Sequence, residues 1–193
     1  MLTFNQYLRE FTDEEKSVAN KTARASGAVG AKAIVPRHVE AVEEKHGKKG
    51  ERHILDFGSG DKAAHTQRLR EKGHHVTAHE FGTNVKPGVH DPDALKKKYH
   101  HVFASNVLNV QSNKKMMGKT LVQIHKATHK GGAFTGNFPE SPRKAADIDA
   151  DHVHGELAKR FHHVERVKGM GTKKAPLFHA THPKEDYKSE HED

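Results

Sequence analysis

Ile54-Leu55-Asp56-Phe57-Gly58-Ser59-Gly60 is the stretch that decides the fold class of this chain. The apolar run over residues 53–57 predicts a buried strand. Glycines directly after a strand let the backbone turn sharply into a helix and let a ligand come close. The next residues, 61–72, have a helical pattern and end at Gly73. Strand, glycine turn and helix in this order predict a Rossmann-like nucleotide site.

The alternation of strands and helices continues along the rest of the chain. Further strands are predicted over residues 75–81, 101–105, 133–138, 161–168 and 176–182. Helices are predicted from Pro36 to His46 and over residues 91–98, 112–129 and 149–160, the third ended by Gly131 and Gly132. This pattern predicts a doubly wound, mostly parallel sheet with helices on both faces. The two strands adjacent at the end predict an antiparallel C-terminal hairpin.

The length of 193 residues fits one domain with short additions at its ends. Residues 1–35 are predicted to form a helical N-terminal cap or lid, and residues 36–183 the nucleotide-binding domain. Residues 184–193 are predicted to be a disordered acidic tail.

Charge is unevenly placed. The formal net charge is +8, but the last eleven residues carry two lysines and five acids, so the rest of the chain carries +11. A basic body suggests a nucleic-acid partner, or only a soluble surface with an excess of positive charge.

Cysteine is absent, which excludes disulfides, thiolate metal sites and a cysteine nucleophile. No apolar run approaches about 18 residues and no signal peptide is visible, so we expect no membrane span and a cytoplasmic location.

The chain contains 19 histidines, several of them in adjacent pairs. No HExxH motif occurs, and we expect no metal site. We interpret the histidines mainly as titratable surface residues that add positive charge below about pH 6.5.

Asp56 lies two residues before Gly58, and an acid at this position distinguishes one family of Rossmann-like proteins from the others that share a glycine turn. The sequence resembles class I S-adenosylmethionine-dependent methyltransferases, whose first motif reads apolar-Asp-x-Gly-x-Gly. The resemblance implies a Rossmann-like sheet of seven strands and S-adenosylmethionine as cofactor. It places Asp56 near the methionine amino group and the cofactor against Phe57, Gly58, Ser59 and Gly60. The family often has a third glycine two positions on, where this chain has Lys62.

Two further positions extend the resemblance toward the nucleoside. Glu80 ends the strand that follows, where a carboxylate accepts hydrogen bonds from both ribose hydroxyls. Phe81 would cover the adenine. Asp91 would meet the adenine amino group, or it would cap the short helix that follows it.

The fourth motif of the family corresponds to the end of the strand that finishes at Ser105. Asn106 and Val107 are predicted to line the cofactor, and Asn106, Asn109 and Asn137 to face the transferred methyl group as catalytic residues. Two short segments resemble segments of phage and bacterial methyltransferases associated with DNA modification: Val107-Leu108-Asn109-Val110 and Lys21-Thr22-Ala23.

The substrate is predicted from loops near the same edge. Phe138, Arg143 and Lys144 would stack a base and hold a phosphate, and Lys21 and Arg24 would belong to a lid. The expected function is therefore methyl transfer to a nucleic acid, possibly DNA. The lack of cysteine excludes a cytosine-C5 mechanism.

Alternatives remain open at this point. A small molecule is nearly as good a substrate, and the chain could be a non-catalytic partner protein that binds S-adenosylmethionine. A nicotinamide-dependent dehydrogenase would also use the glycine turn and Glu80, but Asp56 would repel its pyrophosphate. We expect a monomer or a weak homodimer.

Overall fold

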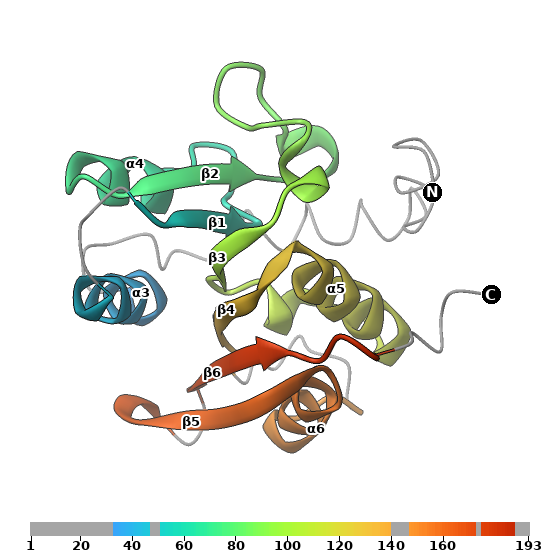
Figure 1. Cartoon of the computed structure of the whole chain (residues 1–193). Coiled ribbons are helices and arrows are strands. Elements are labelled where there is room, and N and C mark those ends of the chain that lie inside the picture. Colours follow the sequence, from blue (N-terminus) through green and yellow to red (C-terminus); the bar gives the residue numbers. More distant parts are fainter. Residues whose placement is uncertain (1–32, 47–50, 140–146, 173–174, 188–193) are drawn as a thin grey trace.

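The computed structural model describes residues 33–46, 51–139, 147–172 and 175–187 (Figure 1). Most of the cap expected over residues 1–35 and most of the expected tail lie outside these ranges, as do Lys21, Arg24, Arg143 and Lys144. No helix in the described ranges is both long enough and apolar enough to cross a bilayer.

Four α-helices, six strands and three short 3-10 helices make up the described residues. The α-helices are α3 (Ile34–Lys45), α4 (Ala64–Glu71), α5 (Lys114–Ala127) and α6 (Ala150–Arg160). The strands are β1 (His53–Phe57), β2 (His75–His79), β3 (Tyr99–Ala104), β4 (Thr128–Asn137), β5 (Phe161–Thr172) and β6 (Ala175–Pro183). The 3-10 helices are η2 (Gly82–Asn84), η3 (Ala94–Lys96) and η4 (Leu108–Val110).

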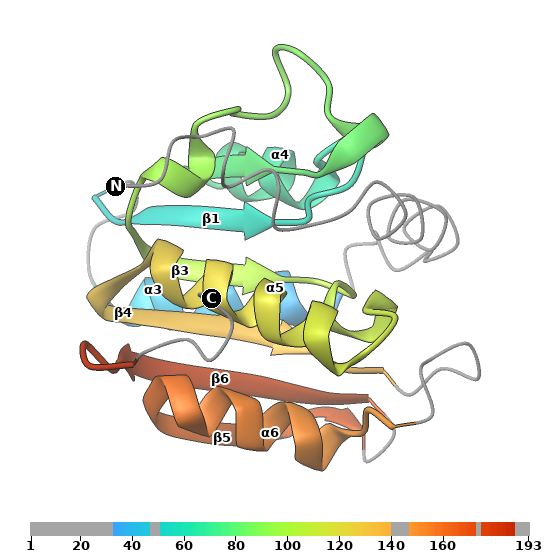
Figure 2. The same cartoon turned by 90° about the vertical axis from the view of Figure 1, so that its right-hand side faces the viewer.

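All six strands belong to one sheet in the order β2-β1-β3-β4-β6-β5. The pairs β1–β2, β1–β3 and β3–β4 are parallel, whereas β6 is antiparallel to both β4 and β5. Helices α3 and α4 cover one face of the sheet and α5 and α6 the other, with the strand directions visible in Figure 2. The predicted doubly wound sheet and its antiparallel C-terminal hairpin are both confirmed.

The described sheet has six strands, not the seven that the family resemblance implied. The missing strand would lie between Glu80 and Asp91. That segment instead contains η2 and a turn, because it carries Gly82, Pro87 and Gly88 and lacks a run of β-branched residues. The helix expected over residues 91–98 is likewise reduced to η3.

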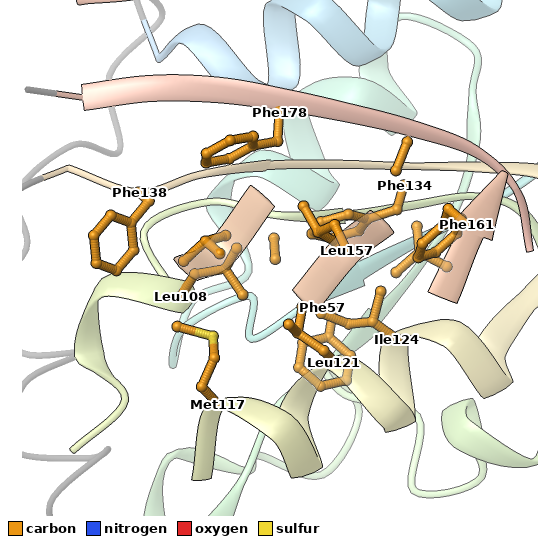
Figure 3. Close-up of a cluster of buried hydrophobic side chains, with 14 of the residues drawn as sticks. Phe57, Leu108, Met117, Leu121, Ile124, Phe134, Phe138, Leu157, Phe161 and Phe178 are labelled. Carbon is orange, nitrogen blue, oxygen red and sulfur yellow. The ribbon is translucent and has the colours of Figure 1, made fainter. Parts of the chain in front are cut away.

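The alternation of side chains along the strands builds a separate core on each face. Leu55, Phe57, Phe134 and Phe178 point to the α5 and α6 side, where they meet Met117, Leu121, Ile124 and Leu157 (Figure 3). Ile54, Phe103 and Leu177 point to the opposite side and pack against Val35, Val39 and Leu69 of α3 and α4. Burial on both faces accounts for the nearly continuous apolar strands of the sequence.

Several histidines are buried, so the surface interpretation was wrong for them. His101 is fully buried and binds Glu43 Oε1 through Nδ1 at 2.9 Å and Thr135 Oγ1 through Nε2 at 2.8 Å. Thr135 Oγ1 also lies 2.9 Å from His179 Nδ1, and Arg52 Nε donates to Glu43 Oε2 at 2.7 Å. This buried polar chain ties α3 to β3, β4 and β6, and its groups satisfy one another.

Acid should destabilise the fold through its buried imidazoles. Burial lowers the pKa of His79 from 6.5 to about 3, because the ring is packed between Phe57 and Phe81. The unfolded chain protonates this ring near pH 6.5 while the folded chain keeps it neutral. The contribution of this ring to the free energy of unfolding is therefore fully present above pH 6.5. It is lost as the pH decreases from 6.5 toward 3, by about 1.4 kcal/mol per pH unit.

Urea unfolding of the wild type and of His79→Phe at pH 7 and pH 5 measures this contribution. We expect the variant to lose clearly less stability than the wild type between the two pH values. An equal loss in both proteins would show that His79 is not buried in its neutral form.

Candidate functional site

The carboxyl ends of the parallel strands meet at one edge of the sheet, and the chain reverses its direction of winding there. After β1 the chain goes to β2 on one side, and then returns to place β3 on the other side of β1. Open α/β sheets bind ligands at such a switch point, in the crevice outside the carboxyl ends of the strands. The glycine turn after β1, the loop after β2 and Asn106 after β3 all lie at this edge (Figure 2).

Backbone hydrogen bonds hold the glycine turn against the end of β2. The N–H groups of Gly58 and Ser59 both donate to His79 O, at 3.0 and 2.9 Å. Ser59 Oγ donates to the same carbonyl at 3.2 Å. Gly58 and Gly60 both have φ +75°, a conformation that glycine adopts without strain. The turn is therefore rigid without any bound molecule.

Gly60 is held at both its N–H and its carbonyl. Its N–H donates to Glu80 Oε2 at 2.6 Å, and Glu80 Oε1 accepts from Phe81 N at 2.7 Å. Its carbonyl lies 2.9 Å from His90 Nε2. Since His90 Nδ1 accepts from Lys86 N at 2.8 Å, a neutral His90 carries its proton on Nε2 and donates to Gly60 O.

Two carboxyl groups lie at this edge, Asp56 buried and Glu80 partly buried. Asp56 is 1% exposed and accepts a hydrogen bond from Thr66 Oγ1 at 2.8 Å. Burial, with a contribution from Glu80, raises the pKa of Asp56 to about 7, and burial also raises the pKa of Glu80. Neither carboxyl forms an ion pair with a described residue. A cation at this edge would stabilise both carboxylates, whereas a phosphate would be repelled.

The two glycines of the turn differ in the space beside them. A Cβ on Gly58 would lie 2.6 Å from Val107 Cγ2, so Gly58 permits close packing with the loop after β3. A Cβ on Gly60 would meet no atom of the described residues within 4 Å. Gly60 therefore borders open space at the edge where a ligand is expected.

Asn106 and Asn137 bind each other across the ends of β3 and β4. Asn137 Oδ1 accepts from Asn106 N at 2.7 Å, and Asn137 Nδ2 donates to Asn106 Oδ1 at 2.8 Å. Asn106 takes a left-handed conformation with φ 58°, which asparagine tolerates better than most residues. Asn109 lies in η4, and its buried Oδ1 has no hydrogen-bond partner among the described residues.

Some of the expected site residues do not present their side chains to a ligand. Phe57 is fully buried in the core, so only its backbone lies at the glycine turn. Phe138 is 1% exposed and packs in the same core, so it cannot stack a base as predicted (Figure 3). In both cases burial of the apolar ring in the core is more favourable than its exposure in a loop at the ligand edge.

Although the N-cap residue of η3 is Asp93, the Asp91 side chain is engaged by neighbouring residues. Its Oδ1 accepts from Asp93 N at 2.8 Å, which begins the turn into η3, and its Oδ2 binds Lys97 Nζ at 2.6 Å. Phe81 is partly buried, and its ring meets those of Phe57 and His79 at 5.3 and 4.4 Å. Phe81 therefore forms part of the wall beside Glu80.

Sequence reasoning missed His90 and Thr66, which support the site through Gly60 and Asp56. His90 is 6% exposed and Thr66 is fully buried. A histidine beside a glycine and an aspartate, as in Gly88-Val89-His90-Asp91, carries no signal that it reaches back 30 residues to Gly60. Thr66 could have been found, since a threonine ten residues after Asp56 falls on the first turns of α4, facing β1.

No protein-family model matches this chain, and no curated protein sequence does. Solved structures do match. A sugar N-methyltransferase from Streptoalloteichus sp ATCC 53650 aligns with a TM-score of 0.61 and 13% identity, over 80% of this chain and 88% of that one. Magnesium protoporphyrin IX methyltransferase from Synechocystis PCC 6803, with bound SAM, aligns with a TM-score of 0.55 and 13% identity over 94% and 85% of the two chains.

A third match is 1,6-didemethyltoxoflavin-N1-methyltransferase from Burkholderia thailandensis, with bound 1,6-didemethyltoxoflavin and S-adenosylhomocysteine. Its TM-score is 0.56 at 17% identity, over 95% of this chain and 92% of that one. The fold of this chain is therefore the α/β Rossmann-like fold of S-adenosylmethionine-dependent methyltransferases, here with a six-stranded mixed sheet.

Proposed function

We propose that this chain binds S-adenosylmethionine at the carboxyl edge of β1, β2 and β3 and transfers its methyl group. The observation that carries the proposal is a pair of carboxyl groups beside the glycine turn, Asp56 buried behind the turn and Glu80 partly buried, with Gly60 open to a ligand on the described side. A ligand with an ammonium and a sulfonium complements these acids, and a pyrophosphate does not. The same contrast disfavours the nicotinamide-dependent alternative.

The residues present fit the cofactor. Each oxygen of Glu80 accepts one backbone N–H and keeps a second lone pair for a ribose hydroxyl. The backbone of Gly58, Ser59 and Gly60 would lie against the ligand, with Phe81 and Val107 as apolar walls for the adenine. Asp56 acts on the methionine ammonium through space or through one water, because its carboxyl is buried behind the turn.

The chain's own residues supply alignment. S-adenosylmethionine provides an activated methyl group, so no nucleophile of the protein is needed. Asn106 and Asn137 hold each other in fixed positions, and amides orient an acceptor through hydrogen bonds but do not accept its proton at neutral pH. Asn109 Oδ1, which has no partner among the described residues, would accept a hydrogen bond from a molecule that reached it.

A nucleic acid remains the proposed substrate, supported by the net charge of +8. The matched structures include enzymes described by their action on a sugar, a glycopeptide and a small molecule, and these support the alternative of a small-molecule acceptor. Arg143, Lys144, Lys21 and Arg24 stay candidates for substrate contact, outside the described residues.

Purified protein given methyl-labelled S-adenosylmethionine with separate pools of DNA, RNA, protein and small molecules tests the activity. We expect label in one pool, and much less label in that pool with the Gly60→Ala protein at a cofactor concentration near the wild-type Kd. Tight cofactor binding with no labelled pool would favour a non-catalytic partner protein instead.

His90 is proposed as a positioning residue for the glycine turn. His90→Phe keeps the volume of the ring and removes the donor to Gly60 O, so we expect S-adenosylmethionine to bind about 5- to 15-fold more weakly, the scale of one buried hydrogen bond. His90→Gln, whose amide can donate to the same carbonyl, should recover part of that affinity. Calorimetric titration of both variants provides the measurement, and equal affinities for the two would refute the positioning role.

A further inference from the structure

The opposite edge of the sheet, where β1, β2, β3 and β4 begin, carries a groove lined by lysines and a row of histidines. The starts of β3 and β4 meet the end of the antiparallel β6 there (Figure 2). The five residues of β1 separate this edge from the glycine turn, a distance of roughly 15 Å. The surface is therefore distinct from the proposed cofactor site.

A groove of about 390 Å³ lies between the start of β4 and the end of β6. Its lining contains the lysines Lys98, Lys130 and Lys184 and the histidines His125 and His129, against a single carboxylate, that of Glu185. Lys98 and Lys130 form no ion pair with any carboxylate in the described ranges. The groove thus has an excess of positive charge.

A row of four imidazoles continues the groove across the edge. The ring of His129 lies 5.5 Å from that of His100, His100 lies 6.1 Å from His53, and His53 lies 4.0 Å from His75. His53, His75 and His129 are exposed, and His100 is half-buried. We call the groove and this row together the basic edge.

Two of these imidazole rings, those of His100 and His129, are oriented by a hydrogen bond at Nδ1, which leaves Nε2 to donate to a ligand. His100 Nδ1 accepts from His53 N at 3.1 Å, and His129 Nδ1 accepts from Gly131 N at 3.3 Å. Each neutral ring therefore carries its proton on Nε2, for which no hydrogen bond occurs within the described part of the chain. Imidazole N–H groups held in this way suit phosphate oxygens.

Lys98 lies in a positive environment at the rim of the groove. Partial burial and the neighbouring Lys126 ammonium both lower the pKa of Lys98. Lys184 Nζ is held at 2.7 Å from Ala158 O and cannot move away freely. An anion in the groove would offset this repulsion and favour the charged form of Lys98.

We propose that the basic edge binds the phosphate backbone of a nucleic acid. Four neighbouring strands span roughly 14 Å, which matches about four phosphates at the roughly 3.4 Å spacing of one DNA strand along its axis. A lipid surface fits less well, because the one large apolar side chain that is clearly exposed in the described ranges is Val85, in the loop after β2 at the cofactor edge. The inference does not depend on methyl transfer, since none of its residues belongs to the proposed cofactor site.

Binding of a fluorescent DNA duplex, measured by anisotropy at several salt concentrations, tests the proposal. Lys98→Glu with Lys130→Glu should weaken binding at least tenfold and reduce the salt slope by roughly 2, about 0.9 per lost phosphate contact. Replacing His53, His75 and His129 together by Gln should weaken binding several-fold without a charge reversal. The matched control is Lys115→Glu with Lys168→Glu, which makes the same charge change on exposed residues of α5 and β5 away from the basic edge.

Equal weakening in the charge-reversal protein and its control would overturn the proposal, because net charge alone would then explain binding. A polyglutamate peptide that binds the same edge more tightly than the duplex at equal charge would also overturn it, in favour of an acidic protein partner. Calorimetry with S-adenosylmethionine on the same variants should give wild-type affinity. This readout separates a failure of the basic edge from a failure of the proposed cofactor site.

Discussion

Replacing Gly60 by alanine is expected to abolish most cofactor affinity while leaving the protein folded. The new Cβ would meet no atom within 4 Å in the part of the chain that the structure describes, so the substitution costs about 1–2 kcal/mol of stability for the left-handed φ of +75°. The methyl group would instead occupy the space proposed for the ligand. Overpacking of this kind costs about 1–3 kcal/mol, which corresponds to a roughly 10- to 100-fold weaker Kd for S-adenosylmethionine.

Gly169→Ala provides the matched control for this prediction. Gly169 has the same φ of +75° and open space within 4 Å, but lies in β5, away from the carboxyl edge of β1. Thermal unfolding should give similar losses of Tm for the two variants, and calorimetry should give weaker cofactor binding only for Gly60→Ala. Unchanged affinity in Gly60→Ala would show that the ligand does not approach this turn.

Glu80→Gln is expected to have an effect of similar size through a different interaction. Its carboxylate holds Gly60 N and Phe81 N, and in the proposal it also accepts from the ribose hydroxyls. Glutamine has one acceptor oxygen, so one backbone N–H is left unsatisfied and the charge-assisted bonds to ribose are lost. Each such bond contributes about 1.5–3 kcal/mol, so we expect roughly 10- to 100-fold weaker binding.

A comparison of S-adenosylhomocysteine with its 2′-deoxyribose analogue separates ribose recognition from damage to the turn. The wild type should prefer the ribose form, and Glu80→Gln should bind both forms about equally. Glu71→Gln, an exposed residue at the end of α4, serves as the control and should behave as the wild type does. An undiminished preference in Glu80→Gln would place the ribose elsewhere.

The sheet could be predicted because its signals are local. Apolar strands, the glycine turn after β1 and the final hairpin each follow from a short pattern of side chains. The start of β4 differs from the sequence prediction, because Gly131 and Gly132 favour the end of a helix by their local pattern. In the structure α5 ends at Ala127 and β4 runs through both glycines, where a Cβ on Gly132 would lie 2.9 Å from His100 O.

Long-range contacts account for most of what the sequence did not predict. The hydrogen bonds of His101 to Glu43 and Thr135 join residues 58 and 34 positions apart, and no periodicity marks them. The reciprocal bonds of Asn106 and Asn137 span 31 positions. The sequence placed these asparagines at strand ends through the family resemblance, but their pairing depends on β3 and β4 being neighbours.

Calorimetric titration of the wild type with S-adenosylmethionine at pH 7, in two buffers of different ionisation enthalpy, tests the central claim most directly. Since the pKa of Asp56 is about 7, the free protein holds this carboxyl partly protonated, and a cationic ligand should drive it to the carboxylate and release a fraction of a proton. We predict saturable binding whose heat differs between the buffers, and the same for S-adenosylhomocysteine, which keeps the ammonium. No binding of either compound would contradict the proposed site and function together.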